Sequence, residues 1–218
     1  MSNNPTSLSL IQHHPAEGPG AIGHWAKARG VTLKVFRADL GELPAVGGAP
    51  VIILGGPYEA NAGPDWLGEE RRWLAACLAQ DAPVFAICLG AQLLARALGG
   101  DVRRMAETET GWTEVSFADG RLLKVLEWHE DAIELPPDAR LLASSARCEQ
   151  QMYSVGPTRV GLQFHPEWNA ESVAQLNAHF AEESPLPRDQ DDSVAHGQVF
   201  DWLQGTLDEW WAVQRVAG

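Results

Sequence analysis

Cys88 stands where an apolar strand is expected to give way to a helix. The run Val84–Ile87 is short, apolar and β-branched at its first and last residues, which favours a strand. Strong helix formers follow from Leu89 until Gly99–Gly100 interrupts them. A cysteine at a helix N-terminus meets free N–H groups and the positive end of the helix dipole, which favour the thiolate, and Gly90 allows a tight turn. The stretch therefore predicts a nucleophile elbow with sulfur as the attacking atom.

Two further motifs also come just after apolar strands. His165 is two residues before Glu167, and a histidine can act as base toward a thiol while a carboxylate orients the imidazole. Gly55–Pro57 allows backbone N–H groups to turn toward a neighbouring site, as an oxyanion hole requires. Each motif alone has a plainer interpretation: a buried structural Cys88, a polar strand-end histidine and an ordinary turn. Together they favour one catalytic site, because the carboxyl ends of parallel strands meet at one edge of a sheet.

The elements that must position these residues alternate between strand and helix in the first part of the chain. The expected strands are 8–11, 31–37, 51–54, 84–87 and 160–164. The expected helices are 20–29, 89–98, 170–181 and 196–216. A further helix is expected to begin at Pro64–Trp66, with Asp65 as its cap. Short extended runs are expected at 102–103, 112–117, 122–126, 141–144 and 151–155, and a surface loop at 184–193. Continuous apolar strands alternating with helices predict an α/β fold with a mostly parallel sheet flanked by helices, and a small antiparallel strand region.

Composition and charge limit the classes of protein to which the chain can belong. The chain has 218 residues, 45% of them hydrophobic, which fits a single domain over residues 1–218. Its formal charge of −13 argues against nucleic acid and anionic membranes as partners. No apolar run approaches the length of a membrane span and Met1–Pro5 does not resemble a signal peptide, so we expect a cytoplasmic protein. Three widely spaced cysteines, Cys77, Cys88 and Cys148, argue against a disulfide framework or a zinc site.

Three motifs together carry a family resemblance. Gly55–Pro57, Ile87–Gln92 and Gln163–Glu167 resemble, in order and spacing, those of the class I (triad-type) glutamine amidotransferases. The intervening sequence is similar to the stand-alone branch related to the glutaminase domain of GMP synthase. The segments that fit this branch are 111–112, 128–131, 135–137 and 142–145, so the similarity runs from about Val51 to Glu167.

The resemblance implies a flavodoxin-like α/β fold and a Cys-His-Glu triad. By position, Cys88 is the expected nucleophile, His165 the base and later acid, and Glu167 the group that orients His165. The resemblance also implies that the backbone N–H groups of Gly56 and Leu89 bind the oxyanion and that Gln92 lines the substrate pocket. Two positions depart from the family pattern. Ala86 replaces a common glycine and predicts a more crowded elbow, and Ala91 replaces a frequent histidine or methionine of the pocket wall.

The implied reaction is hydrolysis of the glutamine side-chain amide to glutamate and ammonia through a thioester, without metal or organic cofactor. The chain has no Gly-rich, lysine-containing ATP loop, so ammonia is expected to pass to a separate synthetase. One alternative is a γ-glutamyl peptide hydrolase that acts without a partner. Another, from a different class, is a non-catalytic binding or regulatory module with a relic triad.

Other conspicuous side chains have structural interpretations. His13 and His14 are expected in a polar loop rather than at the border of the site. His129 is expected to serve the structure or to contact the backbone part of the substrate. The tryptophans near the C-terminus, Trp202, Trp210 and Trp211, are expected to pack a helix, with a partner surface as the minority alternative.

Overall fold

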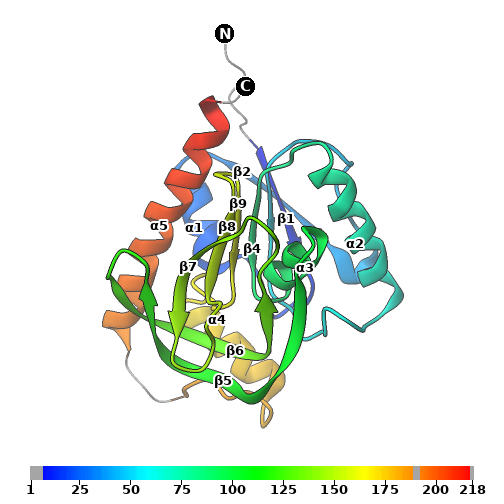
Figure 1. Cartoon of the computed structure of the whole chain (residues 1–218). Coiled ribbons are helices and arrows are strands. Elements are labelled where there is room, and N and C mark those ends of the chain that lie inside the picture. The colour runs from blue at the N-terminus through cyan, green and yellow to red at the C-terminus, as the bar shows by residue number, and fades with distance from the viewer. Residues whose placement is uncertain (1–6, 189–191, 217–218) are drawn as a thin grey trace.

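A computed structural model describes residues 7–188 and 192–216 of the chain (Figure 1). The strands are β1 (Ser7–Gln12), β2 (Thr32–Arg37), β3 (Val51–Ile53), β4 (Val84–Ile87), β5 (Asp101–Phe117), β6 (Leu122–Glu134), β7 (Arg140–Ser145), β8 (Met152–Val155) and β9 (Arg159–Leu162). The helices are α1 (Gly20–Ala28), the short 3-10 helix η1 (Ala38–Leu40), α2 (Asp65–Leu78), α3 (Leu89–Ala97), α4 (Ala170–Phe180) and α5 (Ser193–Val216). The strands form one sheet in the order β2-β1-β3-β4-β9-β8-β7-β5-β6.

The first five strands of that order are parallel, as the sequence predicts. Consequently the carboxyl ends of β1, β3, β4 and β9 lie along one edge of the sheet. His13, Gly55, Cys88 and His165 all come within three residues of these ends. The topology alone therefore brings together four segments that are far apart in sequence.

Helices cover both faces of the parallel part (Figure 1). Ile52 and Phe85 belong to the apolar cluster that includes buried residues of α1 and α5. Their neighbours Ile53 and Ala86 belong to a second cluster, with buried residues of α2 and α3. Since successive side chains of a strand point to opposite faces, burial on both faces explains why β3 and β4 are apolar at every position.

The antiparallel part of the sheet has longer strands than expected. The short runs predicted at 102–103 and 112–117 belong to one strand, β5, and the run predicted at 122–126 continues to Glu134 in β6. The register of the pair shifts between Arg104 and Glu109, and Gly111 has a φ of 75°. The irregularity hides the alternation of apolar and polar residues that marks a strand, so the sequence pattern missed the middle of both strands.

Two details of the helices differ from the sequence prediction. Pro64 occupies the N-cap position of α2 without a side-chain hydrogen bond, and Asp65 is the first helical residue, so the prediction of Asp65 as the cap is wrong. A carboxylate in the first turn still favours the helix through its dipole. The final helix begins at Ser193 instead of 196. Within the predicted loop 184–193, residues 184–188 and 192 form neither helix nor strand, and 189–191 lie outside the described residues.

The C-terminal tryptophans pack as predicted. Trp210 and Trp211 are buried, and Trp202 is partly buried against the same apolar cluster as α1. Their side chains hold α5 along one face of the sheet. Among the described helices, none combines the length and apolar character needed to cross a membrane.

Candidate active site

Cys88 occupies a strained turn between β4 and α3. Its φ of 48° and ψ of −110° are unusual for a residue with a side chain, and such strain is typical of functional sites. The turn is fixed by two backbone hydrogen bonds, from Cys88 N–H to the Leu162 carbonyl (2.7 Å) and from Gly90 N–H to the Leu54 carbonyl (3.1 Å). A Cβ on Gly90 would lie 2.4 Å from the Ile53 carbonyl oxygen, so only glycine fits there. The strand, turn and helix follow the predicted elbow.

His165 and Glu167 form a buried pair beside Cys88. The imidazole Nδ1 donates a hydrogen bond to Glu167 Oε1 at 2.8 Å, and each side chain is 2% exposed. Burial alone would lower the pKa of His165. The negative charges and hydrogen bonds of Glu167 and Cys88 outweigh it and raise that pKa well above the usual value. The pair therefore favours an imidazolium next to the sulfur.

The groups that hold this pair were not predicted from the sequence. Trp168 stacks on the His165 ring with a centroid distance of 3.5 Å and an interplanar angle of 8°. The N–H of Ala21, at the start of α1, donates to the Glu167 carbonyl at 2.9 Å. A Cβ on Gly20, whose φ is 45°, would lie 2.1 Å from that same oxygen. The signals in the sequence were an aromatic residue directly after Glu167 and a glycine at a helix start.

Gly55 and Gly56 lie between the catalytic candidates and the residues that follow β1. A Cβ on Gly55 would lie 2.8 Å from His165 Cε1 and 3.4 Å from Cys88 Cβ. A Cβ on Gly56 would lie 2.7 Å from His13 Cβ. Both positions thus require glycine, because neighbouring side chains approach the backbone closely.

A chain of amides links Gln92 to the sulfur. Gln92 Nε2 donates to Gln163 Oε1 at 3.3 Å, and Gln163 Nε2 lies 3.6 Å from Cys88 Sγ. Gln163 belongs to one of the three motifs, but no role was predicted for its side chain. Ala86 and Ala91 are fully buried in the cluster with α2 and α3. Ala91 is absent from the cavity wall formed by the described residues, so it is not the pocket-wall residue that the family pattern suggests.

A cavity of about 280 Å³ opens beside the sulfur. Gly56, Cys88, Leu89, Gln92 and His165 line it, whereas Glu167 stands behind His165. The volume suits a small substrate rather than a folded protein segment.

The cavity also brings in charged residues that the sequence analysis did not single out. Glu17 lies in its wall, and burial raises the pKa of Glu17 to about 7, with opposing charge effects from His165 and Glu167. At the rim, Arg104 forms ion pairs with Glu130 and Asp131. The cavity thus offers side chains of both signs of charge.

Comparison with known proteins assigns the family. The sequence model of glutamine amidotransferase class-I matches residues 20–178, which is most of the chain. The chain belongs to the class-I glutamine amidotransferases. The matched residues include Cys88, His165 and Glu167.

The relatives of this chain carry several names. It is 29% identical over 195 residues to the glutamine amidotransferase-like protein YfeJ of Salmonella typhimurium, covering 81% of this chain and 82% of the relative. It is 36% identical over 127 residues to the A subunit of the glutamine-hydrolyzing GMP synthase of Saccharolobus solfataricus, covering 54% of this chain and 66% of the relative. It is 28% identical over 141 residues to gamma-glutamyl peptidase 3 of Arabidopsis thaliana, covering 57% of each. A crystal structure of a glutamine amido transferase from Methylobacillus flagellatus superimposes with a TM-score of 0.82 at 26% identity and covers 94% of each chain.

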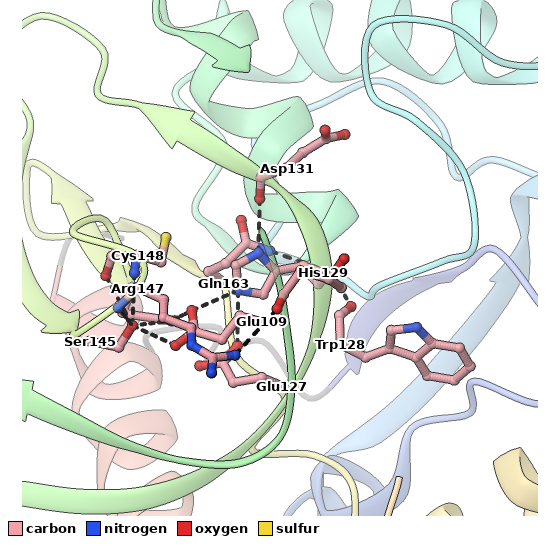
Figure 2. A network of polar contacts seen from close by, with 12 residues as sticks. Glu109, Glu127, Trp128, His129, Asp131, Ser145, Arg147, Cys148 and Gln163 are labelled. Atoms are coloured by element: carbon pink, nitrogen blue, oxygen red, sulfur yellow. Dashed lines mark hydrogen bonds and ion pairs between the residues drawn. The ribbon is translucent and has the colours of Figure 1, made fainter. Parts of the chain in front are cut away.

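Part of the cavity wall belongs to a buried polar network (Figure 2). His129 Nε2 lies 3.3 Å from both Glu109 and Glu127, and its Nδ1 donates to the Asp131 carbonyl at 2.9 Å. Burial alone would lower the pKa of His129, but its contacts with the two carboxylates raise it to about 10. Burial raises the pKa of Glu127. His129 lines the cavity as well as pairing with these carboxylates, so the geometry is compatible with both roles predicted for it.

The same network is the place where the described residues come nearest to a metal site. The ligand atoms of Glu109, His129 and Cys148 lie within 4.8 Å of one another. The Glu109 carboxylate already accepts hydrogen bonds from Ser145 Oγ (2.7 Å) and Gln151 Nε2 (2.9 Å). The group is accounted for as a buried ion cluster, so we assign no metal to it.

The expectation that His13 lies in a polar loop is wrong. His13 is fully buried, and its ring nitrogens contact the Gly55 carbonyl and the Glu70 carboxylate. The cause is Glu70 of α2, a buried carboxylate 57 residues away that no local pattern reveals. His14, in contrast, is half-buried and packs against His179 and Phe180.

Proposed function

We propose that this amidotransferase hydrolyses the side-chain amide of glutamine with Cys88 as nucleophile, His165 as base and acid, and Glu167 as the orienting group. The observation that carries the proposal is the strained Cys88 beside the buried His165–Glu167 pair, with Cys88 and His165 in the wall of one small cavity. Glu167 holds Nδ1 of the imidazole, so Nε2 is left for the thiol, and the charged ring is stabilised.

The reaction then proceeds in two halves. The thiolate of Cys88 adds to the amide carbon and forms a C–S bond, while the carbonyl oxygen becomes an oxyanion. The intermediate collapses to a thioester, and the amide nitrogen leaves as ammonia with the proton held by His165. Water then loses a proton to His165 and adds to the thioester, and a second collapse releases glutamate and the thiol. Atoms balance as glutamine plus water giving glutamate plus ammonia, without an external oxidant or reductant.

We assign the oxyanion donors to the backbone N–H groups of Gly56 and Leu89. Both residues line the cavity beside Cys88, and Leu89 opens α3, where the helix N-terminus favours negative charge. Gln92 lines the same cavity and is assigned to the substrate pocket. Arg104 and the acidic residues Glu130 and Asp131 at the rim suit the α-carboxylate and α-ammonium groups of a γ-glutamyl substrate.

The fate of ammonia separates two versions of this function. Similarity to the A subunit of GMP synthase supports transfer of ammonia to a separate synthetase subunit. Similarity to gamma-glutamyl peptidase 3 supports hydrolysis of γ-glutamyl peptides without a partner. We favour the amidotransferase version as the working function, and three free, buried cysteines suit a reducing compartment such as the cytoplasm.

The deciding experiment is steady-state hydrolysis by the purified chain alone. Glutamate and ammonia are measured with glutamine and, separately, with a panel of γ-glutamyl peptides. Turnover of either substrate class supports the cysteine hydrolase, and turnover of neither supports the relic module. Preference for a γ-glutamyl peptide over glutamine would replace the amidotransferase version by the peptidase.

The nucleophile is tested by cysteine variants in the same assay. Cys88→Ala should abolish hydrolysis with little change in the melting temperature, because the elbow tolerates a small side chain. Cys77→Ala is the matched control, since Cys77 is also buried but belongs to α2 and does not line the cavity. Activity that survives in Cys88→Ala, or disappears in a folded Cys77→Ala, would overturn the assignment.

A further inference from the structure

The peptide that joins Gly55 to Gly56 is held by a side chain outside the proposed triad. His13 Nδ1 lies 2.8 Å from the Gly55 carbonyl oxygen, and a histidine N–H is the only donor in that pair. The described residues contain no cis peptide bond. In a trans peptide the carbonyl of one residue and the N–H of the next point in opposite directions. Holding the Gly55 carbonyl therefore fixes the direction of the Gly56 N–H, and Gly56 lines the cavity.

His13 is itself fixed by Glu70. His13 Nε2 lies 3.0 Å and 2.9 Å from the two carboxylate oxygens, and both side chains are 0% exposed. The Gly55 carbonyl can only accept, so Nδ1 carries the proton that it donates there, and Nε2 shares a proton with the Glu70 carboxyl group. Burial alone would lower the pKa of His13, but the charge and hydrogen bond of Glu70 and the Gly55 carbonyl outweigh it and raise the pKa. Trp66 stacks on the ring with a centroid distance of 6.0 Å.

Such a restraint matters because the peptide lies between two glycines. Without Cβ atoms, rotation of the Gly55–Gly56 peptide has little steric opposition from its own residues. A rotated peptide would aim the Gly55 carbonyl toward the cavity and remove the Gly56 donor. It would also leave the buried His13 N–H without an acceptor, which disfavours the rotated state.

We propose that His13 and Glu70 are positioning residues that keep the oxyanion hole formed in the isolated chain. The inference rests on the proposed function, since the direction of the Gly56 N–H matters only if an oxyanion forms beside Cys88. It also bears on the partner question. A hole that is held open by the chain's own residues allows hydrolysis without an activating subunit.

The kinetic test compares three variants of the full chain. In His13→Ala we expect kcat for glutamine, or for the best γ-glutamyl substrate, to fall about 100- to 1000-fold with KM changed by less than about threefold. His13→Asn should restore kcat to within about tenfold of wild type, because its amide Nδ2 lies near the former Nδ1 and can donate to Gly55. His24→Ala is the matched control: it removes the same side chain from an exposed position of α1 and should equal wild type.

A purely structural role of His13 predicts different changes in kcat and in the melting temperature. The melting temperature would fall while kcat of the folded variant stayed within about threefold of wild type, and His13→Asn would bring no kinetic recovery. Either result would overturn the proposal. If His13→Ala does not fold, His13→Asn is compared directly with wild type. With the hydrogen bond to Gly55 retained, a kcat within about tenfold of wild type supports the proposal, and a greater loss contradicts it.

A crystal structure of a His13 variant separates this inference from the proposed function. If wild type hydrolyses no γ-glutamyl compound, the proposed function fails, but the orientation of the Gly55–Gly56 peptide can still be seen. A peptide that rotates or takes two orientations in His13→Ala supports the positioning role. A peptide that keeps one orientation in His13→Ala, with the Gly55 carbonyl still directed at the vacated space, refutes it.

Discussion

The imidazole of His165 is restrained on three sides. Glu167 accepts from Nδ1, Trp168 covers one face of the ring, and the backbone N–H of His165 donates to the Leu126 carbonyl at 2.9 Å. A ring held in this way can turn little when a proton moves through it. The arrangement therefore suits repeated transfer between sulfur, the leaving nitrogen and water, as the proposed function requires.

The first prediction ranks the two polar members of the proposed triad. His165→Ala should lower kcat about a thousandfold or more, because base and acid catalysis are lost together. Glu167→Ala should lose less, since Trp168 and the backbone still hold the ring. Rates for both variants and wild type on the same substrate check the order. A greater loss at Glu167 than at His165 would contradict it.

Glu17 predicts a pH effect on activity. Its pKa of about 7 means that the carboxyl group is neutral in mild acid and ionises as pH rises through 7. A negative charge there would stabilise the imidazolium of His165 and make it a weaker acid toward the leaving ammonia. We therefore expect kcat/KM of wild type to fall several-fold above pH 7, and Glu17→Gln to keep its plateau. Glu114→Gln, at an exposed position of β5, serves as the control.

The pH profiles of the three proteins check this assignment. If Glu17→Gln retains the same decline above pH 7 as wild type and Glu114→Gln, then another group causes it.

At the scale of the elements, the sequence was most informative about the site at the ends of the short apolar strands. Cys88 and His165 each follow a short apolar strand, and the sheet order places β4 and β9 side by side. Apolar runs and glycine turns identify such strands locally, and the parallel pairing then brings their ends together. This explains why the catalytic candidates and the fold class could be predicted before the structure.

Long-range partners could not be predicted in the same way. Glu70 reaches His13 from α2, and Glu109 reaches His129 across the β5–β6 pair. In sequence each of these acidic residues looks like an ordinary solvated charge of a helix or strand. Their burial depends on how the helices and strands pack against one another. No periodic pattern within a single element reveals this packing. Trp168 was likewise missed, because stacking depends on a turn that no pattern describes.

The start of α1 provides a prediction at this scale. Gly20→Ala should lower both activity and stability, because its φ is 45° and its Cβ would lie 2.1 Å from the carbonyl oxygen of Glu167. The clash with backbone must displace Glu167 or α1, and we expect a loss of kcat of about tenfold or more. Thermal unfolding and steady-state kinetics measure the two effects.

Gly23→Ala is the matched control in the same helix. A Cβ there would make only ordinary contacts, 3.7 Å from Pro19 Cγ. Replacing a helical glycine by alanine should stabilise the protein by roughly 0.5–1 kcal/mol and leave kcat unchanged. Equal behaviour of the two variants would show that α1 does not clamp Glu167.

For the molecule as a whole, buried ionisable groups link folding to pH. His129 holds a proton more tightly when folded, because its pKa rises from the ordinary 6.5 to about 10. Glu17 and Glu127 also have raised pKa values, so the folded state favours their protonated forms as well. All three groups bind protons more tightly in the native state. Raising the pH must therefore weaken folding through each of them.

The last prediction follows from this sign. The contribution of His129 is complete below about pH 6.5 and is lost progressively as the pH rises to about 10. We expect the free energy of unfolding to fall by roughly 1–3 kcal/mol between pH 7 and pH 9, measured by urea denaturation at fixed ionic strength. His129→Gln retains an amide donor for Glu109 and Glu127 without a titrating ring, so its slope over this range should be shallower. His24→Gln changes an exposed histidine of α1 and should keep the wild-type slope. A wild-type stability that is flat or rises from pH 7 to pH 9 would mean that the Glu109–His129–Glu127 cluster does not hold its proton as the geometry indicates.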